Sequence, residues 1–260
     1  MGLIVVSSLR NVFLFIRLIL LMRYLFNFFC PDYRLSKILF ENRNHVIINP
    51  EEVTLARLIS SVSSYIDNAV SVVYKTISES VKNSKILIPV GITGESVKIA
   101  AECVKSALHP VLQVSLPVST VQMEYMYRMK GPKMVETIKS LVSMCRSYSE
   151  EVEFEALDAT RAEMPFLVEC IKAAEESGAT SISISDDSGE MMGDEIGAFV
   201  AEVKKETKLP LIIKVSNHLS MGVSDALFAL KAGADGIKCS ISGKNALSTD
   251  EFASALRAKG

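Results

Sequence analysis

The stretch that decides the fold is residues 152–185, VEFEALDATRAEMPFLVECIKAAEESGATSISIS. It begins with the β-rich run Val152–Ala156 and ends with a second one, Thr180–Ser185. Between them, apolar residues recur at helical spacing from Leu167 to Ala174, and Gly178 follows as a residue that can leave a helix in the left-handed conformation. A strand, a helix and a second strand of these lengths predict a right-handed βαβ unit with parallel strands.

The same pattern repeats along the chain. Further β-rich runs lie at residues 85–90, 110–116, 210–215 and 236–241, and further amphipathic helices are predicted around residues 196–203 and 223–230. Weaker strand signals near Ile38 and Tyr65-Ile66 raise the number of strand–helix units to about eight, the number that closes a (β/α)8 barrel. We therefore predict an α/β fold, a parallel (β/α)8 TIM barrel, as one domain over residues 31–260.

An open, doubly wound parallel sheet is the alternative. Such sheets often bind a nucleotide at a glycine-rich turn after the first strand. The sequence contains neither G-x-G-x-x-G nor G-x-x-x-x-G-K, so the barrel is favoured.

Composition excludes several functional classes. The 260 residues are 49% hydrophobic and 22% charged, which is typical of a globular protein with one large core. With 28 Lys and Arg against 30 Asp and Glu, the chain has no basic field to hold a phosphate backbone, and we expect no nucleic-acid partner. Five widely spaced cysteines without a C-x-x-C pair predict a reducing, cytoplasmic environment.

Residues 1–30 differ from the rest and form an apolar N-terminal extension. Arg10, Arg17 and Arg23 divide it into apolar stretches shorter than the ~18 residues that a membrane helix needs. One interpretation is that this segment associates with a membrane while its arginines snorkel to the lipid surface. The other is an appended or misassigned start of the chain, with Met22 as the true beginning. We favour the second, and we expect no membrane partner.

Five segments in order carry a family resemblance: 49–52 (NPEE), 119–125 (STVQMEY), 152–161 (VEFEALDATR), 185–189 (SDDSG) and 230–235 (LKAGAD). With these segments the chain resembles the isopropylmalate synthase, homocitrate synthase and hydroxymethylglutaryl-CoA lyase family, whose members carry a pyruvate carboxyltransferase domain. The resemblance implies a metal-dependent TIM barrel. It also implies an acyltransferase of amino-acid biosynthesis that condenses acetyl-CoA with an α-keto acid, or a carbon–carbon lyase.

The resemblance further implies one divalent metal, held by an Asp in Arg-Asp-Gly, two His in His-x-His and an Asn. In this chain the matching positions are Arg43-Asn44-His45, Lys214-Val215-Ser216 and Asn245. None of the four ligand positions carries a negative charge or an imidazole. We therefore expect no metal cofactor, or at most a weakly bound divalent metal, with Asn44 and Asn245 as remnant positions.

Other positions implied by the resemblance have also changed. Gln122 stands where the family has a His, and Asp187 stands where it has a Thr that helps to hold the substrate carboxylate. We take Lys214, Asp187 and Gln122 as candidate catalytic residues. The candidate substrate-binding residues are Arg43, Asp158, Arg161, Ser185 and Ser216.

Three interpretations of Lys214 remain open. It pairs with Asp187 or another carboxylate and has only a structural role; it acts as a Schiff-base nucleophile, with Lys238 a weaker candidate; or it is a fixed cation that, with Arg43, binds an anionic small molecule.

These interpretations correspond to three functions. The first is an acyltransferase of the isopropylmalate synthase type with impaired metal chemistry, and the second is a non-catalytic barrel that binds a small molecule or a partner. The third is a metal-free lyase or aldolase. The sequence does not decide whether the chain forms a homo-oligomer.

Overall fold

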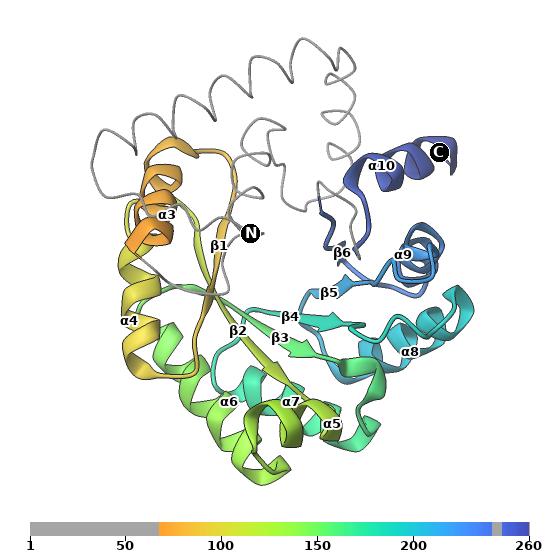
Figure 1. Ribbon diagram of the computed structural model, residues 1–260, viewed down its shortest axis with the longest axis horizontal. Helices are drawn as coiled ribbons and strands as arrows, with labels where there is room; N and C mark the ends of the chain where they lie inside the picture. The colour runs from red at the N-terminus through yellow and green to blue at the C-terminus, as the bar shows by residue number, and fades with distance from the viewer. Residues whose placement is uncertain (1–67, 241–245, 260) are drawn as a thin grey trace, which may run out of the picture.

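The computed structural model of the protein describes residues 68–240 and 246–259. The described strands are β1 (Ile86–Val90), β2 (Pro110–Pro117), β3 (Glu151–Leu157), β4 (Ser181–Ser185), β5 (Leu211–Lys214) and β6 (Gly236–Ile237). They pair in chain order, and every pair is parallel. The sheet curves around a common centre, and the helices lie outside it (Figure 1). This is the arrangement expected for part of a (β/α)8 barrel.

Helices connect the strands. The longer ones are α3 (Asn68–Ser80), α4 (Gly94–Cys103), α6 (Gly131–Arg146), α7 (Met164–Glu176), α8 (Gly193–Glu206), α9 (Gly222–Lys231) and α10 (Thr249–Lys259). Three short segments, α5 (Thr120–Gln122), the π-helical η2 (Met123–Tyr127) and the 3-10 helix η3 (Ala159–Arg161), follow the carboxyl ends of β2 and β3. Within the described residues, no helix is both long and apolar enough to cross a bilayer.

The two faces of the strands differ in chemistry. In β3, Val152, Phe154 and Ala156 are fully buried and belong to the apolar core together with the inner faces of α6 and α7. Glu153 and Glu155 alternate with them and therefore face the interior of the curved sheet. The parallel register places Ser115 of β2 and Ser183 of β4 beside Glu155, so the interior face is polar across neighbouring strands.

The described part confirms most of the predicted elements. Each of the predicted strands between residues 85 and 215 is present, with ends that differ from the prediction by at most one residue. β6 is shorter than predicted, because regular pairing with β5 ends at Ile237. Gly178 and Gly233 have φ angles of +103° and +105°, as expected for glycines that end helices. Residues 1–30 and the strands predicted near Ile38 and Tyr65-Ile66 lie outside the described residues.

The segment after β2 differs from its helical pattern. The helical spacing of Met123, Met126 and Met129, with Tyr125 and Tyr127 nearby, predicts a core-facing helix stripe in preference to a binding stripe. Met123 is buried, and Tyr127 and Met129 are partly buried against the core. Tyr125 is 84% exposed and Met126 is 69% exposed, so the prediction was wrong for these two residues. The segment is a π-helical turn, whose spacing differs from that of an α-helix, and it ends at Arg128 with a φ angle of +53°.

Candidate functional site at the barrel mouth

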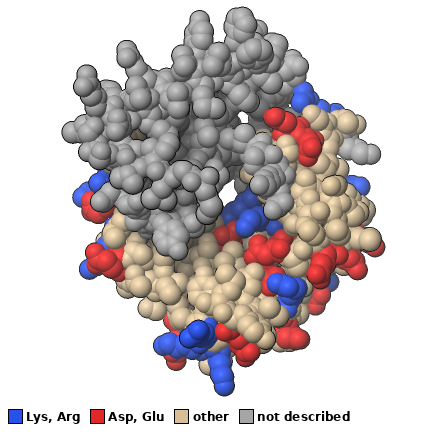
Figure 2. All heavy atoms as spheres, viewed as in Figure 1, with Lys and Arg blue, Asp and Glu red and all other residues tan. Residues whose placement is uncertain are grey.

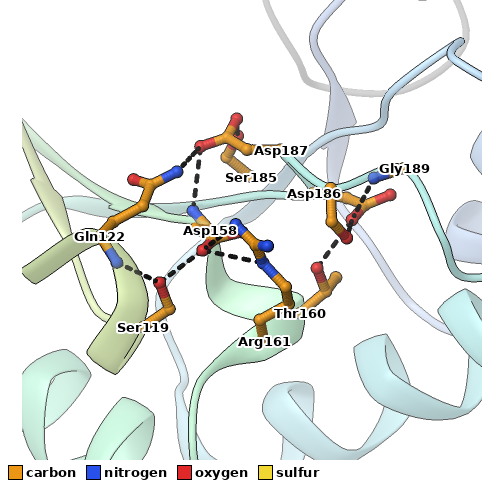
Figure 3. A network of polar contacts seen from close by, with 10 residues as sticks. Ser119, Gln122, Asp158, Thr160, Arg161, Ser185, Asp186, Asp187 and Gly189 are labelled. Atoms are coloured by element: carbon orange, nitrogen blue, oxygen red, sulfur yellow. Dashed lines mark hydrogen bonds and ion pairs between the residues drawn. The ribbon is translucent and has the colours of Figure 1, made fainter. Parts of the chain in front are cut away.

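The polar side chains that the sequence singles out gather where the strands end. Parallel strands bring their carboxyl ends to one edge of the sheet, so the segments that follow them meet there. Acidic and basic side chains gather in the hollow at the centre of the molecule (Figure 2). The residues that form the polar network at this edge are Ser119, Gln122, Asp158, Thr160, Arg161, Ser185, Asp186, Asp187 and Gly189 (Figure 3).

Asp158 is the fully buried anion of the site. It follows β3 directly and has a left-handed φ angle of +56°. The Ser119 hydroxyl donates to Oδ2, and the Arg161 guanidinium donates from Nε to Oδ1 at 2.8 Å and from Nη2 to Oδ2 at 2.8 Å. The hydrogen bonds to Asp158 raise the pKa of Arg161 above its ordinary value. Two candidate substrate-binding residues, Asp158 and Arg161, therefore bind each other.

Asp187 joins three strand ends. Its Oδ1 accepts a hydrogen bond from the Ser185 hydroxyl, and its Oδ2 accepts one from the backbone N–H of Asp158 at 3.1 Å. The Gln122 amide lies farther away, with Nε2 at 3.5 Å from Oδ2. The Lys214 ammonium lies 3.7 Å from Oδ1. The structure thus brings the three candidate catalytic residues together and contains the ion pair that the sequence suggested for Lys214.

Asp186 fixes the loop beyond β4. It is 5% exposed, and its Oδ1 accepts hydrogen bonds from the Thr160 hydroxyl at 2.7 Å and from the backbone N–H of Gly189 at 3.1 Å. Gly189 has a φ angle of +67°, and a Cβ atom there would lie 2.5 Å from the Ser216 hydroxyl oxygen. The close contact between this loop and the end of β5 therefore requires glycine.

Ser216 is held by its own loop. Its hydroxyl oxygen accepts a hydrogen bond from the backbone N–H of His218 at 3.1 Å. Among residues 68–240 and 246–259, no group of three His, Cys, Asp or Glu side chains is placed to hold a metal ion. Arg43, Asn44 and Asn245 lie outside this part of the chain.

A charged network in the barrel interior was missed by the sequence analysis. Lys238 Nζ lies 2.7 Å from Glu153 Oε1 and 3.0 Å from Glu155 Oε1. Gln113 donates to Glu153 at 2.7 Å, and Ser115 donates to Glu155 at 2.7 Å. The signal was present: Glu153 and Glu155 are two residues apart and alternate with the apolar residues of β3, which places both on one face.

A model of the HMGL-like family matches residues 60–259, which is most of the chain. The chain belongs to the HMGL-like family. Curated relatives include the 2-isopropylmalate synthases of Stenotrophomonas maltophilia (strain R551-3), 32% identical over 56% of this chain, and of Aquifex aeolicus (strain VF5), also 32% identical over 56% of this chain. The match covers 29% of each of these relatives, so the chain spans about a third of the length of the curated relatives it matches.

Solved structures support the fold of this HMGL-like chain. An HMG-CoA lyase from Acinetobacter baumannii superposes with a TM-score of 0.67 at 12% identity, over 86% of this chain and 82% of that one. The HMG-CoA lyase of Pseudomonas aeruginosa gives a TM-score of 0.63 at 12% identity, over 86% and 83%. Together with the six parallel strands of the described part, these similarities confirm a parallel (β/α)8 barrel.

Proposed function

We propose that this HMGL-like barrel binds a small carboxylate compound at its mouth through Lys214, without the metal-dependent condensation that the family resemblance implies. The observation that carries the proposal is the position of Lys214. Its ammonium lies at the end of β5, 3.7 Å from Asp187, with 42% of the side chain exposed. A lysine in this place supplies a fixed positive charge to a ligand that enters from solvent.

The residues at the metal positions do not fit a divalent cation. Lys214 contributes a positive charge where a ligand donor would be needed, and Ser216 contributes a hydroxyl that already accepts a hydrogen bond from His218. The sequence has three His in all, at positions 45, 109 and 218, so His-x-His occurs nowhere in it. The proposed binding therefore involves no metal ion.

The interior network favours fixed charges over covalent chemistry at Lys238. Burial alone would lower the pKa of Lys238, but the carboxylates of Glu153 and Glu155 outweigh burial and raise the pKa above its ordinary value. A protonated ammonium has no lone pair with which to attack a carbonyl group, which argues against a Schiff base at Lys238.

We also propose a small molecule as the partner, since the near-neutral net charge of -2 gives no basic field for a nucleic acid. A cytoplasmic location is proposed because the five cysteines include no C-x-x-C pair and no disulfide framework.

Calorimetric titration of the full chain with pyruvate, in EDTA and in excess Mg²⁺, tests the proposal. We expect the same affinity in both buffers and a loss of about tenfold or more in Lys214→Met, because the positive charge is removed. Lys105→Met is the matched control, since the Lys105 side chain is 73% exposed and pairs with Glu102. Binding that requires Mg²⁺, or that survives in Lys214→Met, would contradict the proposal.

An acyltransferase of the 2-isopropylmalate synthase type is the second candidate. It is supported by the names of the curated relatives. Release of free coenzyme A from acetyl-CoA and a keto acid, measured with Mg²⁺, Mn²⁺ or Zn²⁺, distinguishes the two functions. We expect little or no turnover, because developing enolate charge has no Lewis acid to stabilise it.

A metal-free lyase that uses Lys214 is the third candidate. Borohydride reduction in the presence of pyruvate would trap a lysine adduct, detectable as a mass increase that is lost in Lys214→Met. We expect no adduct.

A further inference from the structure

Lys214 and Asp187 lie next to each other at the mouth with unused hydrogen-bonding capacity. Their charged atoms are 3.7 Å apart, which is an ion pair but too long for a hydrogen bond. Within the described part of the chain, no hydrogen bond involves the Lys214 ammonium, which has three N–H donors. The side chains are 42% and 26% exposed, so both groups can reach a ligand.

The Asp187 carboxylate can accept more than the protein gives it. Its two close donors are the Ser185 hydroxyl and the Asp158 N–H. The Gln122 amide is at 3.5 Å, the outer limit of a hydrogen bond. Because an ionised carboxylate has about four acceptor sites, Asp187 has capacity for a further donor.

We propose that Asp187 makes the mouth selective for an α-amino carboxylate, whose carboxylate binds Lys214 and whose ammonium binds Asp187. The inference rests on the proposed function, which supplies the Lys214 contact. An α-amino acid carries its ammonium and carboxylate on the same carbon, and this short separation suits two protein charges a few ångströms apart. An α-keto acid places a carbonyl oxygen, an acceptor only, against the Asp187 carboxylate, which repels it.

The charges around the pair favour a ligand with a positive group. Asp158 is paired with Arg161, and Asp187 with Lys214. Asp186 adds a buried negative charge that forms no salt bridge within residues 68–240 and 246–259. The described mouth therefore has an excess of negative charge, which makes a zwitterion a tighter ligand than a purely anionic carboxylate such as pyruvate.

Three ligands with the same three-carbon skeleton test the inference: alanine, lactate and pyruvate. Alanine offers an ammonium next to the carboxylate, lactate a hydroxyl donor without charge, and pyruvate an acceptor. In calorimetry with the full chain we expect alanine to bind about tenfold or more tightly than pyruvate, with lactate between them. In Asp187→Asn the preference for alanine should fall to within about threefold, because the amide carries no charge and can itself donate to a carbonyl group.

Asp194→Asn is the matched control, since Asp194 is an exposed acid in the first turn of α8. It should keep the wild-type order of affinities, and far-UV circular dichroism checks that both variants fold. Pyruvate binding as tightly as alanine, still lost in Lys214→Met, would overturn the inference and leave the proposed function intact. Lactate binding as tightly as alanine would also overturn the inference, because it would show that the site does not need a positively charged donor. Failure of all three ligands to bind, or alanine binding that Lys214→Met leaves unchanged, would overturn the proposed function and the inference with it.

Discussion

The Lys238 ammonium lies 2.7 Å from Oε1 of Glu153 in the barrel interior. It also contacts Glu155, whose carboxylate is attracted by Lys214, which in turn pairs with Asp187. Burial raises the pKa of Glu155, but Lys238, Lys214 and the Ser115 hydroxyl together bring it below its ordinary value. Negative and positive charges therefore alternate from the interior to the mouth, and Lys214 is attracted by Glu155 on one side and by Asp187 on the other.

Replacing Lys238 by methionine should destabilise the fold strongly. The variant leaves Glu153 and Glu155, which are 4% and 6% exposed, buried without their shared cation. Breaking a buried ion pair by removing one partner typically costs about 3–5 kcal/mol. We expect a loss of this size in the free energy of unfolding, measured by urea denaturation at neutral pH. Lys105→Met should change it by less than about 0.5 kcal/mol.

A triple variant separates charge from packing. Glu153→Gln and Glu155→Gln in the Lys238→Met background remove both buried charges, so much of the lost stability should return. If the triple variant is no more stable than Lys238→Met, the charge explanation is wrong.

Helix and strand positions could be predicted from the sequence because periodicity and glycine positions are local signals. The run Val152–Ala156 alternates as a strand must, and Gly178 marks a helix exit by its own backbone preference. Lys238, by contrast, is predicted from the sequence only as a weak candidate for a nucleophile. Its partners are 83 and 85 residues away in the chain, and only the register of β3 and the return of the chain at β6 bring them together.

The candidate site was predictable as a set of residues but not as a set of bonds. Asp158, Arg161, Ser185, Asp187 and Lys214 do meet at the strand ends. Arg161 binds Asp158 and is therefore not available to a ligand. This pairing depends on the left-handed turn at Asp158. Such a conformation is uncommon in residues other than glycine, and composition does not signal it.

Gly189→Ala should destabilise the mouth through a steric clash with Ser216. The new Cβ atom would lie 2.5 Å from the Ser216 oxygen and 2.8 Å from its Cβ atom, at a φ angle of +67°. Overpacking and left-handed strain each cost about 1–3 kcal/mol. We expect a loss of about 2–4 kcal/mol in the free energy of unfolding.

A double-mutant cycle with Ser216→Gly isolates the clash. Removing the Ser216 side chain leaves the backbone strain at position 189 but relieves its contact with the new Cβ atom. The interaction free energy between Gly189→Ala and Ser216→Gly should therefore be about 1 kcal/mol or more. Strict additivity would show that the loop does not approach β5 as closely as described.

Asp225→Asn should stabilise the protein near neutral pH. Asp225 is 4% exposed, and within the described residues its Oδ1 has no hydrogen-bond partner. Burial, and then the nearby Asp186 carboxylate, raise its pKa from 3.8 to about 6. The folded state therefore favours the protonated form, and ionisation above the raised pKa reduces stability. We expect the neutral amide to add about 1–3 kcal/mol to the free energy of unfolding at pH 7.5.

The gain in stability from Asp225→Asn should increase with pH. Because the folded-state pKa is raised, the stability that the acid contributes is fully present below about pH 4 and is lost as the pH rises through about 6. Urea denaturation at pH 4.5, 5.5, 6.5 and 7.5 should show the advantage of Asp225→Asn growing with pH. Asp194→Asn, at an exposed position, should show no such trend. An advantage that is the same at all four pH values would contradict the raised pKa.

Introducing histidines at positions 214 and 216 should create metal affinity that the natural residues lack. Residues two apart in a strand point to the same side, and two imidazoles there would replace a repelling ammonium and a weak hydroxyl donor. We expect the Lys214→His/Ser216→His variant to bind Mn²⁺ at least about tenfold more tightly than the wild type in calorimetry. Each single variant should gain less, because one imidazole cannot close the site and, in Ser216→His, Lys214 still repels the ion. Wild-type protein that already binds Mn²⁺ as tightly as the double variant would show that Lys214 does not oppose the metal. The proposal of metal-free ligand binding would then have to be given up in favour of the acyltransferase.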